Sequence, residues 1–63
     1  MHPATEQILK YFEYGHLPEH LQRVSKPFSD LAHDVASNLS GPEATVCLRK
    51  LLEAKDCAVR SAI

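Results

Sequence analysis

Two long stripes of apolar residues, joined by a short Gly-Pro segment, restrict the folds open to this chain more than any other feature. The first stripe consists of Leu21, Val24, Phe28, Leu31, Val35 and Leu39. Intervals of three and four residues place these side chains on one face of an α-helix, whereas a β-strand requires alternation. The stripe predicts a long helix over residues 18–39, opened by Pro18. Pro27 lies inside it, where proline removes a backbone hydrogen bond, so we expect a kink or a restart capped by Ser25.

The second stripe predicts another long helix, over residues 41–62. Its members are Ala44, Cys47, Leu48, Leu51, Leu52, Ala54, Ala58, Val59, Ala62 and Ile63. Ser40 and Glu43 have the spacing of a capping box, with Pro42 in the first helical turn. We therefore expect Ser40 to be the N-cap of this helix.

A third, shorter helix is predicted over residues 3–14. Pro3 suits a first turn, and Ile8, Leu9 and Phe12 share one helical face. Gly15 follows where a left-handed residue often ends a helix.

The predicted elements indicate one all-α domain over residues 1–63. Because the link between the long helices is short, they are expected to form an antiparallel helical hairpin preceded by the short helix. A chain of 63 residues supports only a small core. The second stripe is also too wide for one partner helix, so we expect a homo-oligomeric helical bundle.

Composition argues against several classes of function. Seven Lys and Arg against eight Asp and Glu give a formal net charge of -1, which is unlike a protein that coats DNA. No apolar run is long enough to cross a membrane and the start does not resemble a signal peptide, so we expect a cytosolic protein. Cys47 and Cys57, ten residues apart in one predicted helix, are expected to be free, partly buried thiols.

Catalytic and metal chemistry have little support in the sequence. Ser25, Ser29 and the two cysteines have no evident base as a partner, so we expect no catalytic residues and no cofactor. His16 and His20 have the spacing of helical metal ligands, but Pro18 lies between them. We therefore expect no metal site.

Aromatic and cationic residues offer a binding hypothesis. Tyr11, Phe12 and Tyr14 precede a turn, and Lys26 comes within reach once the chain folds back. A base can stack on a ring while a cation holds a phosphate. The alternative is that Phe12 belongs to the core and the tyrosines cover it.

Lys55 interrupts the apolar face of the last helix. Its ammonium must emerge at the edge of the core or be paired. In one interpretation Lys55 extends to solvent while Asp56 and Arg60 form a surface ion pair. In the other, Lys55 or Arg60 faces a ligand phosphate or a symmetry-related copy.

A set of short motifs resembles a known family, the phage anti-CBASS and anti-Thoeris nucleotide sponges, which share a helical hairpin domain. The motifs are Phe12-x-Tyr14, Gly15-His16-Leu17-Pro18, Leu31-Ala32 and Leu48-x-x-Leu51-x-x-Ala54 with Ala58 and Ala62. The resemblance covers roughly residues 8 to 62, and its distinctive part is the aromatic-Tyr-turn-Pro element.

The resemblance implies a protein that counters host immunity inside an infected bacterial cell. Family members bind a cyclic oligonucleotide or cyclic ADP-ribose messenger and hold it without cleaving it. They assemble as homo-oligomers, typically hexamers built as a trimer of dimers, with pockets shared between protomers.

The resemblance also implies roles for individual residues. Tyr14 corresponds to the base-stacking tyrosine, Lys26 to the phosphate-contacting cation and Ser29 to a hydroxyl ligand. Arg60 corresponds to a cation near the C-terminal end that lines a pocket on the oligomer axis. Phe12 and His16, within the same motif, complete the candidate set of ligand-binding residues.

The competing hypothesis is a small helical oligomer that binds a host or phage protein. Convergence of Tyr14 and Lys26 on a concave site favours the nucleotide sponge. Burial of Tyr14 with Lys26 in open solvent favours protein binding.

Overall fold

The protein is all-α over residues 3–63, the part of the chain that the computed structural model describes. Helix α1 spans Pro3–Lys10, α2 spans Glu19–Asn38 and α3 spans Pro42–Ser61. A linker, residues 11–18, joins α1 to α2 without regular helix. No helix in this part of the chain is both long and apolar enough to cross a membrane.

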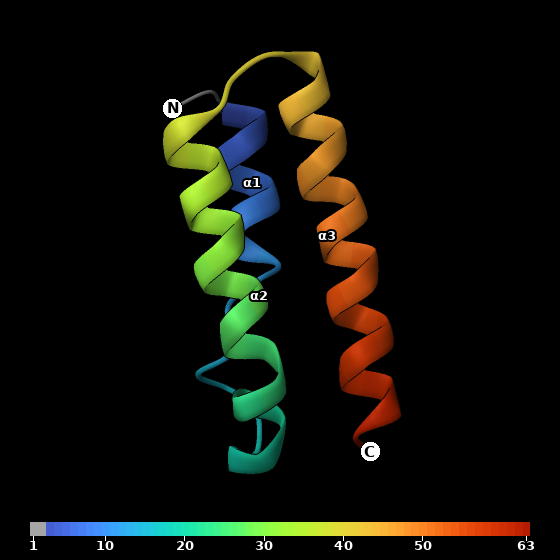
Figure 1. The fold of residues 1–63 in the computed structure, drawn as a ribbon. Helices are drawn as coiled ribbons and strands as arrows, with labels where there is room; N and C mark the ends of the chain where they lie inside the picture. The colour runs from blue at the N-terminus through green and yellow to red at the C-terminus, as the bar shows by residue number, and fades with distance from the viewer. Residues whose placement is uncertain (1–2) are drawn as a thin grey trace.

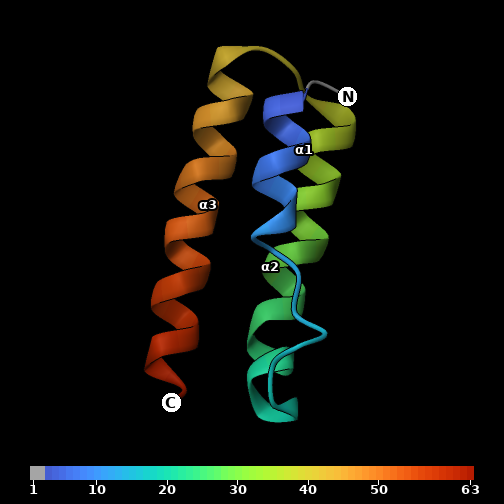
Figure 2. The same cartoon turned by 180° about the vertical axis from the view of Figure 1, so that it is seen from behind.

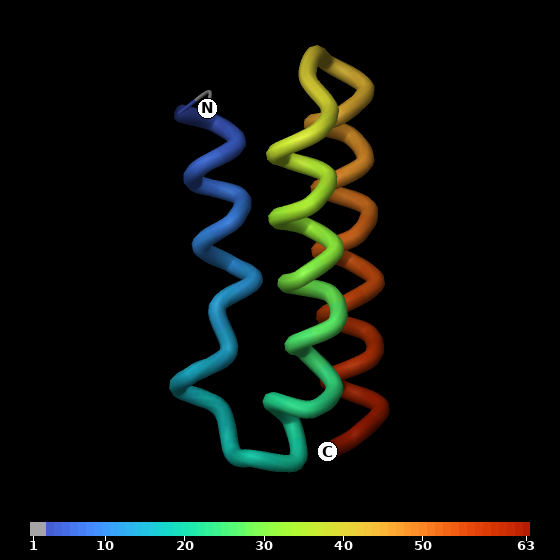
Figure 3. The backbone as a smooth tube through the Cα atoms, turned by 60° about the vertical axis from the view of Figure 1, so that its left-hand side comes forward, coloured from blue at the N-terminus to red at the C-terminus, as the bar shows by residue number. Residues whose placement is uncertain are grey.

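The two long helices lie side by side and run in opposite directions (Figure 1). Seen from behind, α1 packs against the half of α2 nearest the α2–α3 connection, and the linker follows the other half (Figure 2). The backbone trace shows the linker descending beyond α1 before the chain reverses into α2 (Figure 3). The linker therefore lies beside the N-terminal half of α2 (Figure 2 and Figure 3).

The core is formed where all three helices and the linker meet. Leu9 of α1, Phe12 of the linker, Ala32 of α2 and Leu48 of α3 form its buried cluster. Partly buried neighbours surround this cluster, namely Ile8, Phe28, Val35, Ala36, Leu51 and Leu52. The fully buried ring of Phe12 confirms the interpretation that this residue belongs to the core.

Helix α2 continues through Pro27 without interruption. Pro27 lies on the exposed side, where water can replace the hydrogen bond that proline cannot donate. The restart capped by Ser25 is therefore wrong. Ser25 lies on the buried face of α2, and its hydroxyl oxygen has no hydrogen-bond partner among the described residues.

Helix α3 begins one residue later than the sequence pattern indicates. Gly41, with φ 95° and ψ 179°, occupies the N-cap position and Pro42 starts the helix. Glu43 is therefore the second helical residue rather than the third, and no side chain caps this end. The predicted capping box of Ser40 and Glu43 is wrong because the glycine conformation moves the helix start past Ser40.

Helix α1 ends at Lys10, four residues before the expected end at residue 14. Its last turn tightens, since the N–H groups of Tyr11, Phe12 and Glu13 each donate to a carbonyl three residues back. Gly15 does not adopt positive φ and does not end a helix. The tighter turn directs Phe12 into the core.

Much of the second apolar stripe is uncovered. Leu48 is the one buried residue of α3, and the stripe members Cys47, Ala54 and Ile63 are exposed. Further exposed apolar side chains are Val46 of α3, Leu31 of α2 and Leu39, which follows α2. Cys47 and Cys57 are free thiols, and both are exposed rather than partly buried.

Replacing Gly41 by Ala is expected to destabilise the fold by about 1–3 kcal/mol, because its φ and ψ lie in a region that is essentially restricted to glycine. Gly15→Ala is the matched control: φ is not positive there, and no atom lies within 4 Å of an added Cβ. Urea unfolding at one protein concentration measures both variants. Equal losses of stability would contradict this explanation of the start of α3.

Candidate functional site

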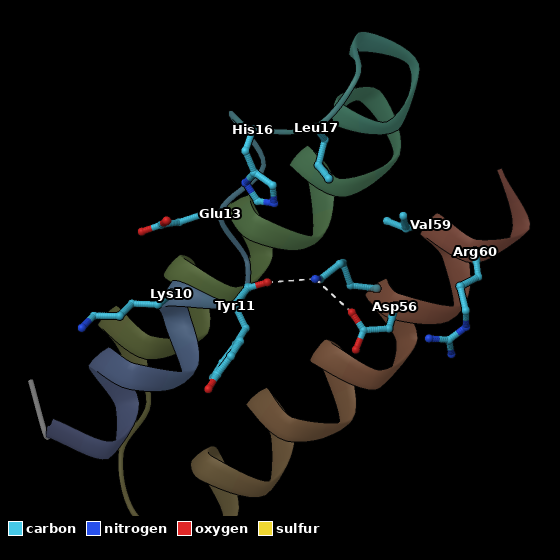
Figure 4. A pocket seen from close by; sticks show the side chains of 9 residues that line it. Lys10, Tyr11, Glu13, His16, Leu17, Asp56, Val59 and Arg60 are labelled. Carbon is cyan, nitrogen blue, oxygen red and sulfur yellow. Dashed lines mark hydrogen bonds and ion pairs between the residues drawn. The ribbon is translucent and has the colours of Figure 1, made fainter. Parts of the chain in front are cut away.

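A cleft of about 310 Å³ separates the linker from the second half of α3. Its lining residues are Lys10, Tyr11, Glu13, His16, Leu17, Lys55, Asp56, Val59 and Arg60. Figure 4 shows Leu17 and Val59 pointing toward one another, while Lys10 and Glu13 project away from α3. We call this feature the linker cleft. It combines an apolar interior with three permanent cations and two carboxylates.

Lys55 ties the linker cleft together. Its ammonium donates a hydrogen bond of 2.8 Å to the carbonyl oxygen of Tyr11 and lies 3.0 Å from a carboxylate oxygen of Asp56 (Figure 4). It also lies 6.0 Å from the centre of the Phe12 ring, at the outer limit of a cation–π contact. The prediction that Lys55 emerges at the edge of the core or is paired is confirmed, since the side chain is 13 % exposed.

Arg60 also lines the cleft, but the predicted ion pair between Asp56 and Arg60 is not formed. Asp56 pairs with Lys55 instead, and the Arg60 guanidinium donates to Sγ of Cys57 at 3.4 Å. Asp56 thus forms an ion pair with the preceding residue, Lys55, and not with Arg60, four residues further along the helix. The charge of Arg60 has no carboxylate partner among the described residues, and its side chain is exposed.

A second group of candidate residues does not line the linker cleft. Lys26 is exposed and forms an ion pair of 2.8 Å with Asp30. The hydrogen bond and charge of Asp30 raise the pKa of the Lys26 ammonium above its ordinary value of 10.5, and the charge of Tyr14 adds to this rise. Tyr14 is half-buried. Lys26 and Tyr14 are therefore within electrostatic reach of one another, and we call this pair and its surroundings the Tyr14–Lys26 face.

Of the remaining candidates, one lines the linker cleft and two are buried. His16 lines the linker cleft with Arg60. Phe12 has no exposed surface, so its ring is closed to a ligand in this conformation. Ser29 is buried on the face of α2 that carries Ser25, and its hydroxyl lies 3.5 Å from Nδ1 of His33. Ser25 and Ser29 are four residues apart and share the apolar face of α2, and this spacing was the sequence signal for their burial.

Neither Tyr14 nor Lys26 lines the linker cleft. They also lie outside a second cavity, of about 410 Å³, which is located at the α2–α3 connection. Among residues 3–63, no charged side chain lines that second cavity; its walls include Ala4, Ala36, Leu39, Pro42 and Leu48. Its chemistry suits an apolar group rather than a phosphate.

Sequence reasoning missed the groups that hold the linker. Gln22 of α2 donates to the carbonyl oxygen of Leu17 at 2.8 Å and approaches that of Gly15 at 3.4 Å. Lys55 and Tyr11 are 44 residues apart, so no local pattern signals their contact. Within residues 3–63, no group of three or more His, Cys, Asp or Glu side chains is arranged to hold a metal ion.

Comparison of the chain with protein-family models, curated proteins and solved structures finds no match.

Replacing Asp30 by Asn is expected to lower the pKa of Lys26 toward its ordinary value, because Asp30 is the main cause of the rise. The folded state holds the Lys26 proton more tightly than the unfolded state. Its stabilising effect is therefore present below a pH of about 10.5 and is lost as pH rises through the folded-state pKa.

NMR titration of the Lys26 side chain measures this shift. Asp34→Asn is the control, because Asp34 is about two helical turns away and bonds to Asn38. A similar titration of Lys26 in both variants would contradict the assignment of Asp30 as the cause.

Proposed function

We propose that this protein binds a cyclic nucleotide messenger and sequesters it without cleavage, as a phage-encoded sponge acting in the cytoplasm of an infected bacterium. The observation that carries the proposal is the placement of the two residues that the resemblance singles out, because Tyr14 is half-buried and Lys26 is exposed. A half-buried tyrosine offers a ring held in a defined orientation, and a lysine that remains charged at neutral pH offers a phosphate contact. The family resemblance of the sequence motifs supports the same ligand class.

The proposal requires assembly, because neither Tyr14 nor Lys26 lines the linker cleft or the cavity at the α2–α3 connection. In the proposed oligomer the hairpin of α2 and α3 is the repeating unit, and a neighbouring copy completes each pocket. Large exposed apolar side chains on both long helices support this part, including Leu31 at 50 % and Val46 at 45 % exposure. Burying them against another copy removes apolar surface from water.

In the proposal, the position of each candidate residue in the structure determines its role. Tyr14 stacks on a base and Lys26 holds a phosphate after exchanging its partner Asp30. Arg60 and His16, in the linker cleft, are available to a more distant phosphate or to a ligand at the oligomer axis. Ser29 and Phe12 support α2 and the linker from beneath, since both are buried.

Calorimetric titration against cyclic dinucleotides, cyclic trinucleotides and cyclic ADP-ribose isomers tests the proposal, with linear nucleotides as controls. We expect submicromolar binding of one cyclic species, and its recovery intact by chromatography. Tyr14→Ala and Lys26→Ala should each weaken binding about tenfold or more, through lost stacking and a lost charge-assisted bond. Asp30→Asn should strengthen it, because a competing carboxylate is removed.

Lys50→Ala is the control, since Lys50 is an exposed lysine of α3 in a long ion pair of 3.6 Å with Glu53. Oligomer mass should be unchanged in every variant. Unchanged affinity in both Tyr14→Ala and Lys26→Ala would exclude this site. Absence of binding across the panel would exclude the sponge.

Leu31→Lys is expected to lower the oligomer mass measured by sedimentation, because a buried ammonium at an apolar interface carries a large desolvation cost. Ser37→Lys is the control: Ser37 is also exposed on α2, but its direction around the helix differs from that of Leu31. A monomer at all concentrations in the unmodified protein would refute assembly.

A second candidate function is binding of another protein. The cavity at the α2–α3 connection favours it, because this cavity has no charged lining residue and lies beside exposed Leu39. Silence across the nucleotide panel, together with a stable oligomer, is the outcome that selects this function.

A further inference from the structure

The linker is held at two points by side chains from the two long helices. Lys55 of α3 donates to the carbonyl oxygen of Tyr11, and Gln22 of α2 donates to that of Leu17, each at 2.8 Å. Both carbonyls belong to residues 11–18, which have no regular helix to bind them. Tyr14 lies midway, three residues from each anchored carbonyl.

The Lys55 side chain is largely covered, although the hydrogen bond that it makes to Tyr11 lies at the exposed edge of the molecule. Only 13 % of its side chain is exposed, with Asp56 and the Phe12 ring beside the ammonium. A charged group in such surroundings is stable only when its hydrogen bonds are made, and here the Tyr11 carbonyl and the Asp56 carboxylate make them. The Lys55 side chain is largely covered and its ammonium bonds to the linker, whereas Lys26 and Arg60 are exposed and bond only within their own helices.

The contact made by Gln22 secures the other end of the linker. Its amide group is partly buried and reaches across five residues to Leu17, with a longer approach to Gly15. Leu17 is additionally tied to Tyr14, because the Leu17 N–H donates to the Tyr14 carbonyl at 3.0 Å. Gln22 is therefore connected to the backbone of Tyr14 through two consecutive hydrogen bonds, by way of Leu17.

We propose that Lys55 and Gln22 are positioning residues that fix the linker, and with it the Tyr14 ring, in the binding conformation before any ligand arrives. This inference rests on the proposed function for its effect on affinity. Ordering several backbone residues costs conformational entropy. If the linker is already ordered in the free protein, binding does not incur this cost and the affinity is higher. Neither residue contacts the ligand.

Amide hydrogen exchange of the free protein tests whether Lys55 and Gln22 fix the conformation of the linker. The N–H groups of Phe12, Glu13 and Leu17 are hydrogen-bonded and report on the linker. In Lys55→Met and Gln22→Leu these amides should exchange about fivefold faster or more, whereas amides in the middle of α2 and α3 keep their rates. Lys50→Met is the matched control on α3, and Lys55→Arg, which keeps a cationic donor, should restore slow exchange.

Titration with a cyclic dinucleotide, cyclic di-AMP first and then the other members of the panel, tests the functional part. Lys55→Met and Gln22→Leu should each weaken binding about fivefold. If both residues act through one linker conformation, the variant with both substitutions should lose less affinity than the product of the two single losses. Lys55→Arg should bind as the unmodified protein does.

Each outcome decides between the two proposals. Linker exchange unchanged in both variants, or equal acceleration along the whole chain, would overturn the positioning role. Faster linker exchange with unchanged affinity would also overturn it. If the unmodified protein binds no cyclic nucleotide, the proposed function fails, and the exchange rates alone then establish or reject the two-point hold on the linker.

Discussion

Burial of the Phe12 ring is the interaction on which the rest of the structure depends. The ring lies where α1 ends, and it contacts a cluster to which each helix contributes one residue: Leu9, Ala32 and Leu48. A buried aromatic side chain contributes a few kcal/mol, a large share of the stability of so small a domain. The tight turn after Lys10 directs this ring inward, and the same turn exposes the Tyr11 carbonyl to Lys55.

The helical elements were predictable because their signals are local. Apolar spacing of three and four residues and the prolines at helix starts indicated three helices, and each is present within a few residues of its expected range. The errors have identifiable causes. Gly41 adopts a conformation that moves the start of α3, and Pro27 is tolerated because it faces solvent. The conformation of Gly41 is not visible in hydrophobic periodicity, which reports faces and not backbone angles.

The candidate site was less predictable, since it depends on contacts between distant residues. Pairing Tyr14 with Lys26 followed from the chain reversal, and it stays a prediction. Ser29 was chosen by its place in the sequence, but its hydroxyl faces inward beside His33. The bond from Lys55 to Tyr11 crosses 44 residues and requires the packing of α3 against the linker, which no short motif encodes.

The ion pairs join neighbours along the chain and never one helix to another. Within residues 3–63 they connect Glu19 to Arg23, Lys26 to Asp30, Lys50 to Glu53 and Lys55 to Asp56. Three of the four are exposed at both partners, where dissolved ions screen them effectively. None of these pairs joins one helix to another, so the screening of charges by dissolved salt removes no ion pair that holds the three helices together.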